Sequence, residues 1–253
     1  MLRYFLKISY NGAPFHGWQR QPADSSVQQV IEEALSRILR SPIAIVGAGR
    51  TDTGVNAMEM YAHFDSPLKL NHTLLPGLNA LCGRDIAIHD IIEVANDLHA
   101  RFDAVSRTYH YYTHEGKNPF IDSFSLQTKP LDYDLMNQAA ARLLEVSDFT
   151  SFAKLHSDAK TNICRVTEAR WDDLGDGRRV FVITSDRFLR NMVRAVVGTL
   201  VEVGRGKMSL DQFDRIVAMR DRCAAGTSMP PYPLFLWKVA YPEGSLAQHS
   251  YKE

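Results

Sequence analysis

The chain has 253 residues, and hydrophobic residues at 45% and charged residues at 23% are ordinary for a globular protein of one large or two modest domains. Its 29 basic and 29 acidic side chains give a net charge of zero, which argues against binding to nucleic acid through bulk charge alone. The first seven residues are too short and too charged for a signal peptide, and no apolar run approaches the roughly 18 residues of a membrane span, so we expect a cytoplasmic protein.

Three cysteines, Cys82, Cys164 and Cys223, are far apart in the sequence and form no C-x-x-C pair. This spacing excludes a zinc knuckle, and we predict three buried, reduced thiols. We expect neither a metal site nor an organic cofactor.

The first hundred residues predict strands interleaved with two helices. Apolar residues alternate with polar ones over residues 2–10, which is typical of a strand. Apolar residues at three- and four-residue steps predict a helix over 25–40, with Ser26 and Gln29 as a capping box. Further along we expect a strand at 43–46, a glycine-bearing loop at 47–54, a strand at 58–64, a helix at 71–81 and a strand at 86–95.

The second half also alternates predicted strands with predicted helices. A strand rich in aromatic residues is expected over 105–114 and a helix over 132–145. Strands at 164–174 and 178–185 predict a hairpin around Gly175, Asp176 and Gly177. An amphipathic helix over 187–204, a helix over 209–222 and a strand over 234–241 complete the chain.

These elements predict an α+β fold of two helix-backed, mainly antiparallel sheet subdomains. We place the subdomains at residues 1–103 and 104–243. The polar segment 244–253 is predicted to be a frayed tail.

Residues that could form a functional site are most concentrated in the loop GAGRTDTGVNA, residues 47–57. As a phosphate-binding loop it fits poorly, because Asp52 stands where a third glycine belongs and a carboxylate would repel phosphate. As a structural turn, it would use Asp52 and its flanking threonines for local hydrogen bonds, which is the commoner role of such residues. In a catalytic loop, Arg50 could keep the Asp52 carboxylate ionised and oriented, and the glycines would let a substrate approach closely.

The catalytic interpretation is favoured by a resemblance to the TruA family of tRNA pseudouridine synthases. The loop resembles that family's G-R-T-D-x-G-V-H-A motif, with Asn56 in place of the usual His and Thr53 at the variable position. Other segments match in the same order, namely Gly17-Trp18-Gln19-Arg20-Gln21, His99-Ala100-Arg101-Phe102, Arg107-Thr108-Tyr109-His110-Tyr111, Asp148-Phe149-Thr150-Ser151-Phe152 and Met192-Val193-Arg194. The matches run from Tyr4 to about Tyr241, which is nearly the whole chain.

The resemblance implies an isomerase that cleaves the bond from uracil N1 to ribose C1′, turns the base and rejoins it through C5, without metal or cofactor. It implies the pseudouridine synthase fold, RRM- or ferredoxin-like subdomains flanking an RNA-binding cleft. Asp52 would be the catalytic group, either attacking C1′ or adding to uracil C6, and the sequence leaves both routes open. Arg50, Arg194 and Tyr109 would bind the substrate, with the tyrosine ring stacking on the flipped uracil. The implied partner is the tRNA anticodon stem-loop, modified at uridines 38, 39 and 40 by a homodimer.

Arginines are candidates for contacts with RNA because the planar guanidinium pairs with phosphate at two points. The predicted contacts are Arg20, Arg101, Arg107 and Arg190. Arg187, Arg190 and Arg194 recur at helical steps, and a solvated polar face is the plain alternative for them. Trp18 and Phe102 could stack on bases, although core packing is the commoner role for each.

Two other functions remain open at this point. A non-catalytic RNA-binding protein with RRM-like sheets would be expected to carry an RNP-type sequence, which is absent. A nucleoside hydrolase would not need dispersed arginines and would usually carry a second catalytic carboxylate or a metal.

Overall fold

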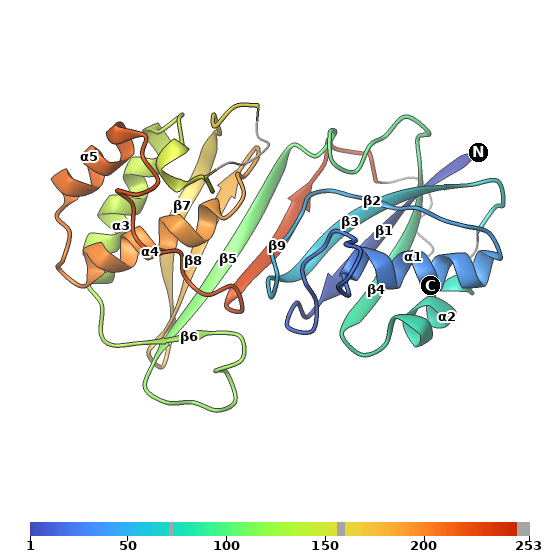
Figure 1. Cartoon of the computed structure of the whole chain (residues 1–253), viewed down its shortest axis with the longest axis horizontal. Coiled ribbons are helices and arrows are strands. Elements are labelled where there is room, and N and C mark those ends of the chain that lie inside the picture. The colour runs from blue at the N-terminus through green and yellow to red at the C-terminus, as the bar shows by residue number, and fades with distance from the viewer. Residues whose placement is uncertain (71–72, 156–159, 247–253) are drawn as a thin grey trace. The chain divides into compact units, whose positions relative to one another are not determined.

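We describe the protein from a computed structural model, which describes residues 1–70, 73–155 and 160–246 (Figure 1). The chain forms two compact units. Unit 1 comprises Met1–Val105 together with the residues from Leu236 onward, and unit 2 comprises Ser106–Phe235. Within the described ranges, no helix is both long enough and apolar enough to cross a membrane.

Unit 1 contains an antiparallel sheet in which β1 (Leu2–Tyr10) lies between β3 (Asn56–Ser66) and β4 (Ile86–Val94). Alternate residues of a strand point to the same face, and Tyr4, Leu6 and Ile8 are accordingly all fully buried. The predicted strand over residues 2–10 is therefore confirmed to the residue.

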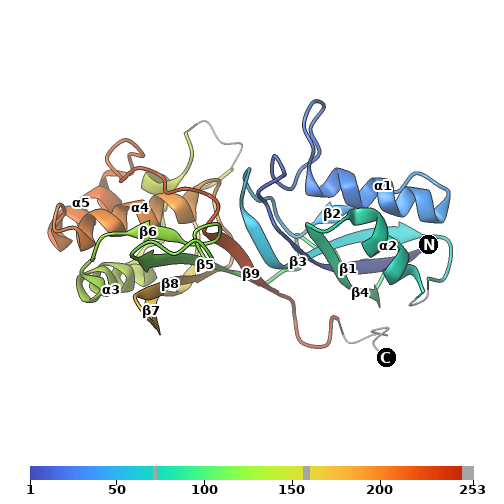
Figure 2. The ribbon, with the colours of Figure 1, turned by 90° about the horizontal axis from the view of Figure 1, so that it is seen from below.

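Among the described residues of unit 1, helices α1 (Val27–Leu39) and α2 (Leu74–Cys82) lie on the same face of the sheet (Figure 2). The Ser26 side chain accepts a hydrogen bond from the backbone N–H of Gln29, which is one half of the predicted capping box. Helix α2 starts later than predicted, and the first two residues of the predicted range 71–81 lie outside the described residues.

The strand predicted over residues 43–46 is wrong for most of its length. Strand β2 covers only Val46–Gly47, which pairs with β3. The backbone N–H groups of Ile43 and Ile45 donate instead to side chains of α1, to Ser36 Oγ at 2.8 Å and to Glu32 Oε1 at 3.1 Å. Side chains of the helix thus take the backbone donors that a strand would have used.

In unit 2, β5 (Ser106–Glu115), β8 (Arg178–Ser185) and β7 (Val166–Gly175) are neighbouring antiparallel strands in that order. The β7–β8 hairpin turns through Gly175, Asp176 and Gly177, all with positive φ, and this confirms the predicted hairpin. A short strand that was not predicted, β6 (Leu126–Thr128), pairs with β5 in parallel. The mixed α+β composition with mainly antiparallel pairing agrees with the predicted fold class.

The helices of unit 2 are α3 (Tyr133–Arg142), α4 (Met192–Gly204) and α5 (Leu210–Met219). Short 3₁₀ turns cover Leu143–Glu145 and Thr150–Phe152. Helix α4 is the most buried, since all of its residues except Arg194 and Glu202 are buried. Because nearly all sides of α4 are buried, its residues are mostly apolar, and this apolar pattern predicted the helix.

The predicted start of the helix over 187–204 is wrong. Asn191 has φ 66° and ψ 1°, in the left-handed region, so the helix begins only at Met192. Arg187 and Arg190 therefore precede the helix, and the predicted helical face of three arginines does not form.

Strand β9 (Leu234–Ala240) begins in unit 2 and ends in unit 1. The following Tyr241 packs edge-on against Phe5 and Tyr61, with 5.4 Å between ring centroids in both pairs. The compact units thus place residues 236–243 with unit 1, whereas the sequence placed them in a subdomain over 104–243. Most of the predicted tail over 244–253 lies outside the described residues.

Two of the three cysteines are buried as predicted. Burial raises the pKa of the Cys82 and Cys164 thiols to about 11, so both are protonated at neutral pH. Cys223 is exposed, and the prediction of three buried thiols is wrong for this residue. It lies beyond the end of α5, in a segment outside the helical core.

Candidate active site

The loop that carries Asp52 joins β2 to β3 in unit 1. The Asp52 carbonyl oxygen accepts a hydrogen bond from the Val55 N–H at 3.1 Å, and Gly54 inside this turn has φ 75°. Asp52 is half-buried at the start of the turn, and Arg50 is exposed. The carboxylate is therefore carried on a tight turn that a substrate can reach.

A second segment, residues 10–18, holds this loop by hydrogen bonds. The hydroxyl groups of Tyr10 and Thr51 lie 2.8 Å apart in a buried contact. The Trp18 N–H donates to the Thr51 carbonyl oxygen at 3.2 Å. Both bonds end on Thr51, which directly precedes Asp52, so they restrict the backbone position from which the carboxylate projects.

Glycines allow the two segments to approach this closely. A Cβ atom at Gly12 would lie 2.2 Å from the Val55 carbonyl oxygen, and one at Gly17 would lie 2.6 Å from the Thr51 carbonyl oxygen. A Cβ atom at Gly47 would lie 2.6 Å from the ring of Trp18, which is 2% exposed. The expected core role of Trp18 is therefore confirmed, and its ring lies against Gly47 at the start of the Asp52 loop.

Asn56 joins the same two segments. Its side-chain Oδ1 accepts a hydrogen bond from the Gly12 N–H at 2.8 Å, and the residue is 2% exposed. The sequence left open what the departure from the family's histidine at this position does. The structure assigns Asn56 the task of satisfying a buried backbone donor beside the Asp52 loop.

We predict that Asn56→Ala destabilises the fold by about 1–3 kcal/mol, because the buried Gly12 N–H would lose its acceptor. Urea unfolding followed by circular dichroism measures the free-energy change. Asn96→Ala is the matched control: Asn96 Oδ1 accepts from the Arg3 N–H at 3.3 Å at an exposed position, where water can replace it. Equal effects of the two substitutions would contradict the assigned role.

Tyr109 lies on β5 in unit 2, opposite Ile183 of β8. Its ring packs edge-on against Phe188, with 5.0 Å between centroids and an interplanar angle of 82°. The side chain is half-buried, so Phe188 fixes the ring while part of it remains accessible.

Arg194 lies in the first turn of α4 and is half-buried. Its Nε donates to the Met229 carbonyl oxygen at 2.6 Å, and the Met229 N–H donates to the Arg194 carbonyl oxygen at 3.1 Å. A Cβ atom at Gly198 would lie 1.9 Å from the Thr227 carbonyl oxygen, so the segment 226–229 lies directly against α4. One edge of the guanidinium is thereby fixed by protein contacts.

The predicted RNA-binding arginines have different surroundings. Arg20 is half-exposed and pairs with the buried carboxylate of Glu32 at 3.2 Å. Arg107 donates to the Asp186 carbonyl oxygen at 3.0 Å, and the guanidinium carbon of Arg101 lies 5.7 Å from the Phe102 ring centroid. Arg190 is exposed ahead of α4.

The structure thus places Asp52, Arg50, Arg20 and Arg101 in unit 1, and Tyr109, Arg194, Arg107 and Arg190 in unit 2. Within unit 1, Arg50 and Asp52 share one loop. That Tyr109 and Arg194 meet Asp52 in a shared pocket stays a prediction.

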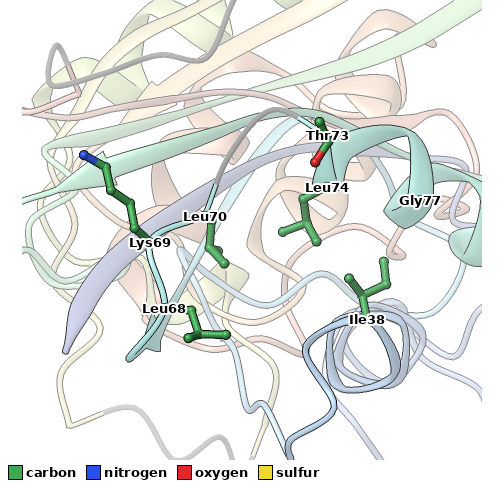
Figure 3. Close-up of a pocket in the computed structure, with 7 residues that line it drawn as sticks. All are labelled: Ile38, Leu68, Lys69, Leu70, Thr73, Leu74 and Gly77. Carbon is green, nitrogen blue, oxygen red and sulfur yellow. The ribbon is translucent and has the colours of Figure 1, made fainter.

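A cavity of about 280 Å³ lies elsewhere in unit 1, at the end of α1 and the start of α2 (Figure 3). Its lining is mostly apolar and includes none of the predicted site residues. Across the described residues, no group of three or more His, Cys, Asp or Glu side chains is placed to hold a metal ion.

Sequence comparisons identify the family. Residues 139–242 match a family described as tRNA pseudouridine synthase. The chain is 54% identical to tRNA pseudouridine synthase A of Porphyromonas gingivalis, over 96% of this chain and 98% of the relative. The proteins of the same name from Parabacteroides distasonis and Bacillus licheniformis are 51% and 36% identical, over 96% and 95% of this chain and 97% and 99% of their own lengths.

A solved structure of a Cbf5–Nop10–Gar1 complex aligns with 92% of this chain and 58% of its own, at a TM-score of 0.35 and 9% identity. This likeness is too weak to support a structural conclusion. The relatives of similar length, at 36–54% identity, show which family the chain belongs to. The chain belongs to the tRNA pseudouridine synthase family.

Proposed function

We propose that this chain isomerises uridine to pseudouridine in tRNA, with Asp52 as the catalytic group. Membership of the family supports the isomerisation reaction. One structural observation supports Asp52 as the catalytic residue. Asp52 starts a tight turn whose preceding residue, Thr51, is held by one hydrogen bond with the Tyr10 hydroxyl and one from the Trp18 N–H. A carboxylate on a restrained backbone that a substrate can reach is what a glycosidic bond cleavage needs.

The reaction constrains what Asp52 does. Cleaving the bond from N1 to C1′ develops positive charge on the sugar, which a carboxylate can stabilise or capture covalently at C1′. Alternatively, the carboxylate adds to uracil C6 and is released after the base has turned. In both routes the base loses its C5 proton and gains one at N1, so no electrons enter or leave the substrate.

Tyr109 and Arg194 are proposed substrate-binding residues together with Arg50. The half-exposed ring of Tyr109 is held by Phe188, which suits it to stack on a flipped base. The substrate site is proposed to be the anticodon stem-loop at uridines 38, 39 and 40, and the active form is proposed to be a homodimer. Arg20, Arg101, Arg107 and Arg190 are proposed phosphate contacts, and the RNA-binding cleft and the cytoplasmic location stay predictions.

Incubation with an unmodified tRNA transcript, followed by nuclease digestion and chromatography, tests the proposed reaction. We expect pseudouridine to replace uridine at constant total base content. A protein that only binds RNA would give no pseudouridine, and a nucleoside hydrolase would release free uracil. Transcripts with cytidine in place of single anticodon-stem uridines would then locate the modified positions.

Arg194→Ala is predicted to lower kcat by about 10- to 100-fold while changing the Kd for tRNA less than threefold, because the guanidinium would act beside the reacting group. Single-turnover rates and filter binding measure the two quantities separately. Arg190→Ala should show the reverse pattern, with weaker binding and an unchanged single-turnover rate. A large loss of affinity in Arg194→Ala would make this residue an RNA clamp instead.

A further inference from the structure

Phe102 is 75% exposed, so the expected core packing of this residue is wrong. It lies in a turn over residues 99–103 of unit 1, next to Arg101. We propose that Phe102 and Arg101 form a contact for one unpaired tRNA nucleotide, with the base stacked on the Phe102 ring and the phosphate paired with Arg101. This inference rests on the proposed function, and it assigns a binding site separate from the residues that act on the target uridine.

The turn is held by its own hydrogen bonds. The His99 N–H donates to Asp103 Oδ2 at 2.6 Å, and the Asp103 N–H donates back to the His99 carbonyl oxygen at 3.1 Å. The N–H groups of Arg101 and Phe102 both donate to His99 Nδ1, at 3.1 and 3.2 Å. Because these four N–H groups are satisfied within the turn, it can present the Phe102 ring in one orientation.

The turn is also anchored to the sheet of unit 1. The Ala100 N–H donates to Nδ1 of His63 on β3 at 3.1 Å, and the Tyr241 hydroxyl donates to the Ala100 carbonyl oxygen at 2.5 Å. Burial is the main cause that lowers the pKa of His63 to about 4, so its ring is neutral and can accept this bond at neutral pH. The turn is therefore fixed to the sheet at both the N–H and the carbonyl of one residue.

Aromatic contacts continue from the sheet to the surface. The rings of His63 and His99 have centroids 4.6 Å apart, and those of His99 and Phe102 have centroids 4.3 Å apart. Phe102 is the outermost ring of this series, and the Arg101 guanidinium lies over it. Supported by His99 and 75% exposed, the ring is a stacking platform for a base when the Arg101 guanidinium moves from the ring to the phosphate.

An RNA nucleotide fits this arrangement better than an apolar protein segment does. Unpaired bases stack on aromatic side chains, and arginine pairs with phosphate or stacks as a cation on aromatic rings. An apolar protein segment would use the ring alone, whereas a nucleotide offers a base to the ring and a phosphate to the adjacent guanidinium. Phe120 of unit 2 is also an exposed phenylalanine, at 92%, but none of the cation–π contacts found among the described residues involves it.

Substitutions separate stacking from charge. Phe102→Ala should weaken tRNA binding about tenfold, because base stacking contributes on this scale, while kcat at saturating tRNA stays unchanged. Phe102→Leu should weaken binding similarly, since it keeps apolar surface without a ring face, and Phe102→Tyr should restore it. The slope of log Kd against log salt should stay constant in Phe102→Ala and fall by about one in Arg101→Ala.

Phe120→Ala is the matched control and should bind tRNA as the wild type does. Equal affinities of the wild type and Phe102→Ala, in an enzyme that forms pseudouridine normally, would overturn this inference alone. A changed molar mass of Phe102→Ala by light scattering would also overturn it and assign the ring to a protein interface. Binding that depends on Phe102 without any pseudouridine formation would overturn the proposed function and leave the platform standing.

Discussion

Asp52→Asn is expected to abolish pseudouridine formation, with a loss of at least about a thousandfold in single-turnover rate, or ~4 kcal/mol of transition-state stabilisation. The amide has nearly the same shape as the carboxylate but carries no negative charge and does not attack carbon. The Asp52 carbonyl oxygen would still accept from the Val55 N–H, so the turn should persist. The Kd for tRNA should therefore stay within a few-fold of the wild-type value.

Asp176→Asn is the matched control for this change. Asp176 lies in the β7–β8 turn with a 94% exposed side chain and φ 53°, a backbone conformation that asparagine also adopts. Its substitution should leave rate and affinity unchanged. Measurable turnover of Asp52→Asn at even one tenth of the wild-type rate would remove Asp52 from the catalytic role.

Gly12→Ala is expected to lower kcat by about 10- to 100-fold, because small displacements of a reacting group cost rate on this scale. The added methyl group would lie 2.2 Å from the Val55 carbonyl oxygen, and backbone atoms cannot move aside as a flexible side chain can. Either segment 10–18 or the Asp52 loop must shift. Single-turnover rates at saturating tRNA, measured beside the melting temperature, separate displacement of the loop from loss of folded protein.

Gly49→Ala provides a control for the stability part of that measurement. A Cβ atom at Gly49 meets nothing within 4 Å, although this residue lies in the same loop as Asp52. Its melting temperature should match that of the wild type, whereas Gly12→Ala should melt lower. A Gly12→Ala enzyme with normal kcat would show that segment 10–18 does not position Asp52.

Elements with a strong local pattern could be predicted from the sequence. The alternation of apolar and polar residues predicted the bounds of β1. Apolar residues at helical spacing, together with a capping residue, located α1 within two residues at each end. Where the pattern failed, a specific backbone event was responsible. The apolar stripe continues upstream of α4, but the left-handed conformation of Asn191 delays the start of the helix, and no periodicity encodes that conformation.

Pairing between segments that are distant in the sequence was harder to predict from the sequence. Strand β6 has three residues and is stabilised by parallel pairing with β5, so its own sequence carries little signal. The Asp52 loop could be found because glycines, an arginine and a carboxylate cluster within eleven residues. The segment that holds it could not, since the contacts of Gly12 and Tyr10 span about forty residues of sequence.

Phe102 shows how an average preference can mislead at a functional surface. Most phenylalanines are buried, and on that basis a core position was the natural expectation. The hydrogen bonds on His99 Nδ1 instead fix a turn that directs this ring outward. Residue type alone does not separate the exposed Phe102 from the buried Trp18, and the arrangement of the turn does.

The return of the chain to unit 1 has a consequence for synthesis on the ribosome. Unit 2 is an insertion between Val105 and Leu236, so its sequence is complete before Tyr241 has been translated. At about 5–20 residues per second, the ring that packs on Phe5 and Tyr61 emerges on the order of ten seconds after the strands that carry them. During that interval Phe5 and Tyr61 lack the ring that packs edge-on against them in the complete chain.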